Sequence, residues 1–207
     1  MIFKKNHQLS TKYIFNRLKQ MYFQKNNQDA PWLTKESILL LEHLLKDSDI
    51  GLEFGSGRST KWLAKRCHSL YSVENHSGWF EKVSVELEDF KNVKYRFRQV
   101  DQNDPSSSGY LDILDELSAN SIDFILNDGK LRGLVALKSI KKLKPGGLFI
   151  LDDAERYISN LFDIHASIGT DKKNMTQDWV KFWKDCRSWR RIWTTDGVSS
   201  TLILFKQ

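Results

Sequence analysis

The sequence predicts an α/β fold: a doubly wound, Rossmann-like, mostly parallel sheet of seven strands that ends in a C-terminal antiparallel hairpin. Two observations predict it. Short apolar strands alternate with helical segments from residue 50 to residue 151, which is typical of a parallel sheet with helices on both faces. Two β-rich runs then flank Asp196-Gly197, a dipeptide that favours a tight hairpin. We expect residues 1–30 to form a basic helical arm and residues 31–207 to form one domain.

The first half of the chain supplies two helices and then three strands. Apolar residues recur at helical spacing over 9–25, and residues 26–31 break that pattern. Thr34 is a suitable N-cap for a second helix. The elements expected after residues 26–31 are helices at 35–46, 59–66 and 78–90 and strands at 50–54, 70–74 and 93–100.

The second half continues the alternation and then changes rhythm. A polar loop at 101–109 precedes it, and Lys144-Pro-Gly-Gly147 is expected to be a turn that leads into the fifth strand. The expected helices are 110–117, 132–143 and 176–186, and the expected strands are 122–126, 148–151, 190–195 and 199–206. The last two strands form the hairpin.

The composition excludes several classes of protein. The 207 residues are 40% hydrophobic and 28% charged, which fits a globular domain with a core and not a disordered chain. No apolar run approaches the roughly 20 residues that a membrane span needs, and no signal-peptide core is visible. Cys67 and Cys186 are far apart, which fits free thiols in a reducing compartment and cannot make a zinc site alone. We therefore expect a cytoplasmic protein.

Charge is concentrated near the N-terminus. The net charge is +6, yet residues 1–30 hold six basic residues against one acidic residue, a balance of +5. Such an arm suits an acidic substrate, a nucleic acid or an anionic membrane surface. A solvated helix face is the simpler interpretation. The sequence does not set the oligomeric state.

A glycine loop follows the first strand of the sheet. Gly55 and Gly57 flank Ser56, and such a pair lets the backbone turn sharply and leaves main chain open to a ligand. Glu53 precedes the loop, and its carboxylate suits a positively charged ligand better than a phosphate. Glu74 ends the second strand, where its two oxygens can accept hydrogen bonds from both hydroxyls of a ribose. These residues favour S-adenosylmethionine.

A dinucleotide is the competing ligand for this loop. Gly55, Gly57 and Glu74 would suit NAD as well, but the third glycine of the dinucleotide fingerprint would fall at Thr60. The terminal hairpin also argues against a nicotinamide dehydrogenase. Asp101, just past the third strand, is a candidate to bind the adenine amino group.

Three aspartates are expected at the carboxyl ends of neighbouring strands, where open α/β sheets bind ligands. They are Asp128, Asp152 and Asp153, and they would repel one another unless a cation or a proton lies among them. We take Asp128 as an acceptor for substrate or for the cofactor amine and Asp152 as the general base. Arg132 follows closely, either to neutralise these acids or to hold an anionic group of the substrate.

Four motifs in order carry a family resemblance: Glu53-Phe-Gly-Ser-Gly57, Glu74, Asp123-Phe-Ile-Leu-Asn-Asp128 and Leu143-Lys-Pro-Gly-Gly-Leu-Phe-Ile-Leu-Asp-Asp153. Over about residues 34–207 the chain resembles class I S-adenosylmethionine-dependent methyltransferases, and it looks most like small-molecule enzymes of the catechol O-methyltransferase kind. The cofactor-binding residues expected from the loop and from this resemblance are Glu53, Gly55, Ser56, Gly57, Glu74, Asp101 and Asp128.

The resemblance also bears on a metal. In catechol-type relatives the positions of Asp128, Asp152 and Asp153 bind magnesium, which prefers oxygen ligands. The catalytic lysine of those relatives would fall at Leu131, so the sequence departs from their pattern. Magnesium stays open, and we assign no metal ligand.

The expected function is methyl transfer from S-adenosylmethionine to an oxygen or nitrogen of a small-molecule acceptor, such as a sugar or a metabolite. Two alternatives stay open. One is a non-catalytic binding module with the same fold. The other is a nucleic-acid methyltransferase that uses the basic arm, although the body shows no interleaving of aromatic and basic residues.

Overall fold

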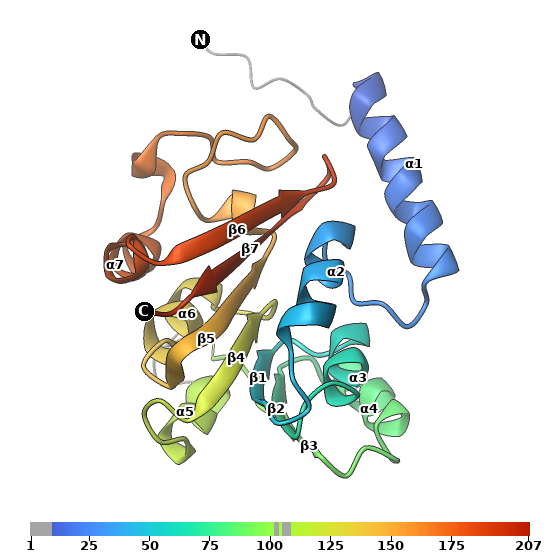
Figure 1. Ribbon diagram of the computed structural model, residues 1–207, viewed down its shortest axis with the longest axis vertical. Coiled ribbons are helices and arrows are strands. Elements are labelled where there is room, and N and C mark those ends of the chain that lie inside the picture. The colour runs from blue at the N-terminus through green and yellow to red at the C-terminus, as the bar shows by residue number, and fades with distance from the viewer. Residues whose placement is uncertain (1–9, 102–103, 105–108) are drawn as a thin grey trace.

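A computed structural model describes residues 10–101, 104 and 109–207. Its centre is one sheet of seven strands in the order β3-β2-β1-β4-β5-β7-β6 (Figure 1). The strands are β1 (Ile50–Phe54), β2 (Ser69–Glu74), β3 (Val93–Phe97), β4 (Ile122–Asn127), β5 (Leu143–Asp152), β6 (Arg190–Thr195) and β7 (Ser200–Phe205). The first five strands are parallel, and β7 pairs antiparallel with both β5 and β6. The predicted fold is thus confirmed.

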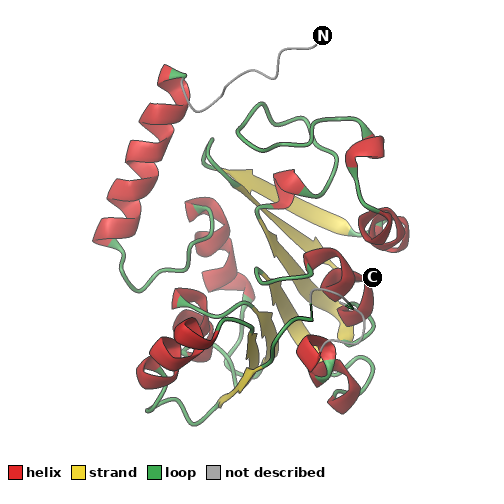
Figure 2. Cartoon of the chain, turned by 180° about the vertical axis from the view of Figure 1, so that it is seen from behind, coloured by secondary structure: helices red, strands yellow, loops and turns green. Residues whose placement is uncertain are grey.

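Helices cover both faces of this sheet (Figure 2). They are α1 (Thr11–Asn26), α2 (Lys35–Leu44), α3 (Arg58–Ala64), α4 (Ser77–Glu86), α5 (Ile113–Glu116), α6 (Arg132–Ser139) and α7 (Gln177–Cys186). Short 3₁₀ turns occupy Gly109–Leu111, Ala154–Arg156 and Lys172–Asn174. Helix α1 lies at the edge of the molecule, outside α2, and has no buried residue.

The core has two parts, one on each face of the sheet. Successive side chains of a strand point to opposite faces, so β4 serves both parts: Phe124 packs with α2 and α3, whereas Ile125 packs with α5, α6 and α7. The parallel strands β1 and β4 are buried along nearly their whole length, as expected for strands covered on both faces.

The strand order reverses between β1 and β4, because β1 pairs with β2 on one side and with β4 on the other. Ligands in open α/β sheets bind at such a switch point, outside the carboxyl ends of the strands. In this chain those ends lead into the glycine loop after Phe54 and into Asp128 after Asn127. The topology therefore brings two of the predicted motifs together.

Several element boundaries differ from expectation. The segment expected to be a turn, Lys144–Gly147, lies inside β5 as an irregularity, with Ile122 opposite Leu143 and Phe124 opposite Leu148. Gly146 has a φ of +80° there, a conformation that glycine adopts at no steric cost. The helix expected at 132–143 ends at Ser139, because the chain must enter β5 at Leu143.

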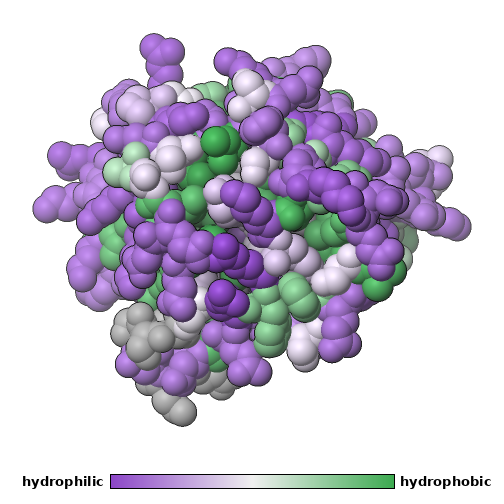
Figure 3. All heavy atoms as spheres, turned by 90° about the horizontal axis from the view of Figure 1, so that it is seen from below, coloured by the Kyte–Doolittle hydropathy of each residue, from purple (hydrophilic) through white to green (hydrophobic). Residues whose placement is uncertain are grey.

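Within the described residues, none of the helices is both long and apolar enough to span a bilayer. The face of the molecule in Figure 3 is mostly hydrophilic, with hydrophobic side chains set among polar ones. Both cysteines are buried and free.

Candidate functional site

Two grooves open at the carboxyl edge of the sheet. The inner groove, of about 460 Å³, lies between the glycine loop and the segment that follows β4, and Glu74 and Arg132 also line it. The outer groove, of about 630 Å³, lies between the connection from α1 to α2, the start of α3 and helix α4. Ser56 and Asp128 line both grooves, so the two spaces meet at these side chains.

The two glycines of the loop serve different purposes. Gly55 has a φ of +89°, and a Cβ there would lie 2.7 Å from backbone atoms of Gly129. It must therefore be glycine for the loop after β1 to pack against the loop after β4. A Cβ on Gly57 would meet only the ring of Trp79, at an ordinary 3.7 Å. The fold does not require a glycine at position 57, so the bare backbone there is available to a ligand.

Glu74 lies at the end of β2, only 5% exposed, and orders the loop around it. Its Oε2 accepts hydrogen bonds from the Ser56 N–H and hydroxyl, both at 2.9 Å. Its Oε1 accepts from the N–H groups of Asn75 and His76, both at 2.8 Å. A carboxylate has about four acceptor positions, and all four are used. A ribose hydroxyl would have to replace the Ser56 hydroxyl, which leaves room for one of the two hydroxyls that the sequence assigned to Glu74.

Glu53 is fully buried beneath the loop. Its Oε2 accepts hydrogen bonds from Thr60 Oγ1 at 2.7 Å and from Ser72 Oγ at 2.6 Å. Its Oε1 has no hydrogen-bond partner among the described residues. Burial raises the pKa of Glu53 to about 7, because the ionised form has lost its water, and the nearby Asp128 adds to the shift. The sequence predicted a cation beside Glu53, whereas in the structure this side chain lies beneath the loop and lines neither groove.

Arg132 joins the ends of β4 and β5. The guanidinium donates to the carbonyl oxygens of Asp152 at 2.7 Å, Asp128 at 2.8 Å and Gly129 at 3.1 Å, and it pairs with the Asp128 carboxylate. Its other acidic neighbour is Asp153, 3.8 Å away. The side chain is only 12% exposed. Arg132 therefore supplies positive charge among the three neighbouring acids. This is one of the two roles that the sequence analysis gave it.

The acids around Arg132 are buried to different degrees: Asp152 is buried, Asp153 is half-buried and the Asp128 side chain is 32% exposed. Burial raises the pKa of Asp128 to about 6, against the opposing effect of Arg132. Burial, with Asp128 and Asp153 nearby, raises the pKa of Asp152 well above its usual range. Asp152 is 7% exposed, accepts a hydrogen bond from Thr201 Oγ1 at 3.2 Å and lines neither groove. Of the two predicted catalytic acids, only Asp128 reaches a groove.

This donor set does not fit a magnesium ion. The described residues contain no group of three or more acidic, histidine or cysteine side chains arranged to hold a metal. Arg132 occupies the position between the carboxylates, and Arg156 pairs with Asp153 at 3.2 Å. No step of the chemistry is assigned to a metal.

The remaining predicted residue, Asp101, is exposed, and its Oδ1 accepts a hydrogen bond from the Asp104 N–H at 3.3 Å. It lines neither groove. Residues 102–103 and 105–108, in the same predicted polar loop, lie outside the described residues. Its proposed contact with adenine stays a prediction.

Sequence reasoning missed two side chains that hold the loop. Tyr95 Oη lies 2.6 Å from Ser56 Oγ, and Ser72 supports Glu53 from β2. Tyr95 lies on β3, and its contact with the loop spans 39 residues. The only available signal was the alternation of β3, which put one face of that strand toward the neighbouring helix and loop.

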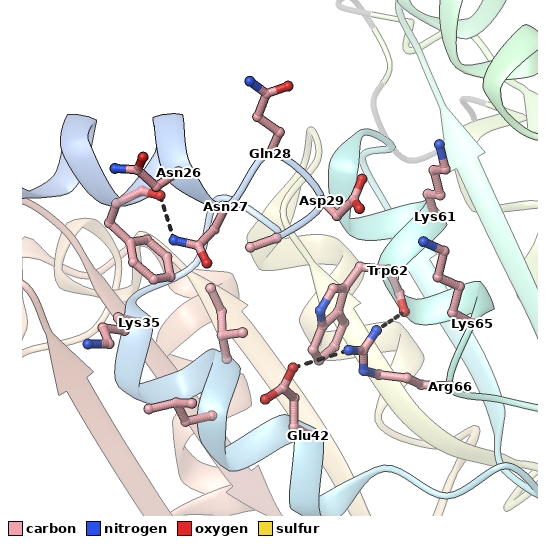
Figure 4. Close-up of a pocket in the computed structure, with 14 residues that line it drawn as sticks. Asn26, Asn27, Gln28, Asp29, Lys35, Glu42, Lys61, Trp62, Lys65 and Arg66 are labelled. Carbon is pink, nitrogen blue, oxygen red and sulfur yellow. Dashed lines mark hydrogen bonds and ion pairs between the residues drawn. The ribbon is translucent and has the colours of Figure 1, made fainter.

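A third groove, of about 700 Å³, lies between α2 and α3 (Figure 4). Lys61 of α3, Lys65 just after α3 and Lys35 at the start of α2 line it. None of the three forms an ion pair within the described chain, whereas Glu42 is paired with Arg66 at 3.1 Å. Three cation–tryptophan contacts lie in this groove or in the outer groove: Arg66 with Trp62, Arg58 with Trp32 and Lys82 with Trp79.

Comparison with known proteins places the fold. No protein-family model and no curated protein matches the chain. Among solved structures, a methyltransferase from Geobacter sulfurreducens is similar with a TM-score of 0.57 and 12% identity, over 92% of this chain and 88% of that one. An rRNA methylase from Streptococcus thermophilus has a TM-score of 0.54 and 17% identity, over 83% and 94%.

A third similar structure was solved with its ligand. Fibrillarin from Aeropyrum pernix, with natively bound S-adenosyl-L-methionine, has a TM-score of 0.54 and 12% identity, over 78% of this chain and 67% of that one. At these identities the comparisons show a shared fold. The chain therefore has the fold of S-adenosylmethionine-dependent methyltransferases, as its motifs predicted.

Proposed function

We propose that this chain is a methyltransferase that uses S-adenosylmethionine and transfers its methyl group to an oxygen or nitrogen of a small-molecule acceptor. The observation that carries the proposal is the meeting of two grooves at Ser56 and Asp128, on the switch point between β1 and β4. One groove would take the cofactor and the other the acceptor. The fold shared with the compared methyltransferases and the motifs of the sequence support the same function.

The residues present fit the cofactor. The open backbone at Gly57, in the outer groove, provides a surface without side chains, and Glu53 supports the loop from beneath through Thr60 and Ser72. Glu74 can exchange the Ser56 hydroxyl for a ribose hydroxyl. S-adenosylmethionine, when bound, supplies an electrophilic methyl group on a positively charged sulfur. Glu53, Gly55, Ser56, Gly57, Glu74 and Asp128 would hold it.

The chain's own residues would then position and deprotonate the acceptor. Asp128, whose pKa of about 6 leaves it ionised at neutral pH, can take a proton from a hydroxyl or an ammonium group at the groove. Arg132 fixes the orientation of that carboxylate. We propose that Asp152, buried behind Arg132, acts on the same site indirectly by holding a proton rather than a charge. Holding two reactants in line contributes up to about 7–11 kcal/mol.

Calorimetry with S-adenosylmethionine, S-adenosylhomocysteine and NAD tests the proposal. We expect both sulfur ligands to bind and NAD to bind at least about 10-fold more weakly, a difference of about 1.4 kcal/mol. Tighter binding of NAD would contradict it. Methyl transfer is then followed with radiolabelled cofactor against hydroxyl and amine acceptors. We expect Asp128→Asn to abolish transfer while the cofactor still binds.

The non-catalytic alternative gives a different result in the same experiments. A binding module of this fold would release heat with S-adenosylmethionine and transfer no methyl group to any acceptor. Asp128→Asn would then change nothing except the affinity.

A nucleic-acid acceptor is the second candidate function, and a specific observation favours it. The α2–α3 groove presents Lys35, Lys61 and Lys65, and tryptophans contact cations along it and along the outer groove. Cations and aromatic rings in one track are what single-stranded nucleic acid requires. Oligonucleotide binding measured at several salt concentrations, with Lys61→Gln and Lys65→Gln, tests it. A salt-dependent affinity that both substitutions weaken would support it.

A further inference from the structure

Helix α1 turns a stripe of large apolar side chains toward solvent. The outward stripe consists of Ile14, Phe15, Leu18, Met21 and Tyr22, which are 48%, 58%, 59%, 52% and 73% exposed. Their spacing places them on one face of the helix. No residue of α1 is buried, although Phe15, Leu18 and Tyr22 also border a groove of about 790 Å³ that Leu33 and Thr195 line from the body. An exposed apolar patch of this kind marks a site of interaction.

The side of α1 that faces the protein is mostly polar, with Tyr13 and Phe23 as its aromatic members. Gln20 donates a hydrogen bond to Asp196 at 2.7 Å in the hairpin turn, and Asn16 packs against Gly197. The carbonyl oxygen of Gln24 accepts a hydrogen bond from Arg58 at 3.4 Å. An ordinary surface helix points its apolar face inward. This helix turns most of its large apolar side chains outward, and Figures 1 and 2 show it at the edge of the molecule with its outer side away from the other described elements.

Positive charge accompanies the stripe. Helix α1 has no acidic residue and four basic ones: Lys12, Arg17, Lys19 and Lys25. Lys19 Nζ lies 4.3 Å from the centre of the Phe15 ring, so its aliphatic part runs along the stripe while its charge stays at the edge. An apolar face with basic residues beside it is the pattern of a helix that lies in a membrane interface.

We propose that the outward stripe of α1 docks this protein on an anionic lipid surface. The apolar side chains would enter the boundary between head groups and acyl chains, and the basic side chains would pair with anionic head groups. A second copy of the chain is a poorer occupant, because two such helices would bring eight cations together with no acid between them. A nucleic acid could pair with the cations but would leave the apolar side chains exposed.

Co-sedimentation of the full chain with vesicles tests the proposal. We expect binding to vesicles of equal parts phosphatidylglycerol and phosphatidylcholine and little binding to phosphatidylcholine alone. The double variant Phe15→Gln, Leu18→Gln should lower the partition coefficient at least about 10-fold, and so should Lys12→Gln, Lys19→Gln at low salt. The matched control is Leu161→Gln, because Leu161 is a single apolar side chain, 90% exposed, outside α1. It should bind as the unaltered chain does.

Other outcomes would overturn the proposal. Equal binding by the control and by the Phe15, Leu18 variant would show that the stripe does not enter the bilayer. Loss of binding only when the lysines are replaced would indicate that the helix binds anions by charge alone. A nucleic acid would then fit as well as a lipid surface. A dimer in light scattering that Phe15→Gln, Leu18→Gln dissociates would assign the stripe to a second copy. Urea unfolding of every variant should match that of the unaltered chain, since the altered side chains are exposed.

Discussion

The ends of β1 and β2 and the ends of β4 and β5 form adjacent parts of the site, yet they are held in different ways. At the first, Glu74 accepts four short hydrogen bonds, three of them from backbone N–H groups within the loops that it organises. At the second, the buried Arg132 lies among three aspartates and pairs with Asp128, while the more exposed Arg156 pairs with Asp153. One end is ordered by local hydrogen bonds, and the other by a buried charge.

This difference has an energetic consequence. Hydrogen bonds contribute about 1 kcal/mol each and can be lost one at a time. A buried ion pair gives little net stability when it is intact, but removing one partner leaves a charge without compensation. Removing Arg132 from the β4–β5 end should therefore lower the free energy of unfolding by a large amount in one step. Each hydrogen bond removed from the β1–β2 end should lower it by a small amount.

The largest expected effect is that of Arg132→Met. The substitution leaves the Asp128 carboxylate without its cation and removes a donor from three carbonyl oxygens, those of Asp128, Gly129 and Asp152. We expect the free energy of unfolding to fall by about 3 kcal/mol, the low end for a broken buried pair, because a third of Asp128 remains in water. Urea unfolding measures it.

Arg156→Met is the matched control for that substitution. Arg156 pairs with an acid of this cluster, Asp153, at 3.2 Å and lies 3.6 Å from the buried Glu155, but its own side chain is 45% exposed. Solvent screens such a pair, so the loss should stay under about 1 kcal/mol. Equal losses in the two variants would remove the distinction between the two ends of the site.

The second prediction concerns pH. It tests how much stability the β1–β2 end loses when the buried Glu53 becomes ionised. Glu53 keeps its proton up to a pKa of about 7 in the folded chain, against an ordinary 4.5. Between these values the unfolded chain ionises first, so the free energy of unfolding should fall as pH rises from 4.5 to 7 and change no further above 7. The decline is on the order of 3 kcal/mol.

Glu53→Gln isolates this effect from that of Asp128, whose raised pKa contributes a decline in both proteins. We expect the unfolding free energy of the unaltered protein to fall relative to that of Glu53→Gln as pH rises from 4.5 to 7, measured by urea unfolding at half-unit steps. A difference that does not change with pH would show that Glu53 ionises normally in the folded chain.

How far the sequence predicts this site depends on whether a requirement is local. The glycine at 55 and the acid at 74 could be found because a tight turn and a strand end each demand a residue type at one position. The pairing of Asp152 with Thr201 joins residues 49 apart, and no local pattern encodes it. The fold followed from the alternation of strands and helices, which is a local signal repeated many times.

Arg132 shows the same limit from the other side. The sequence shows that Arg132 follows Asp128 closely. It does not show whether the two residues form an exposed ion pair or a buried one. The guanidinium is enclosed by the connection from β4 to α6 and by the residues that follow β5. Leu131 and Asp153, one in each segment, both have left-handed conformations with a φ of 52°. Such conformations are uncommon for residues other than glycine and occur where the surrounding structure imposes them.

The third prediction separates the two glycines of the loop. Gly55→Ala forces a left-handed φ on alanine and brings its Cβ to 2.7 Å from the backbone of Gly129, so we expect a loss of about 2 kcal/mol in unfolding free energy. Gly57→Ala has room for its methyl group and should change stability by less than about 1 kcal/mol, while weakening S-adenosylmethionine binding in calorimetry. The reverse pattern would mean that position 57, and not position 55, holds the loop.

The smallest expected effect is that of Tyr95→Phe. This substitution tests whether losing one hydrogen bond at the β1–β2 end lowers stability only slightly. Burial raises the pKa of Tyr95, so the phenol keeps its proton and donates it to Ser56 Oγ at 2.6 Å, while Ser56 donates to Glu74. Removing this one bond should lower the free energy of unfolding by about 1 kcal/mol. Tyr71→Phe is the control, because Tyr71 only accepts an exposed hydrogen bond from Lys94 and should change almost nothing. A loss as large as that of Arg132→Met would mean that this end, too, depends on a single residue.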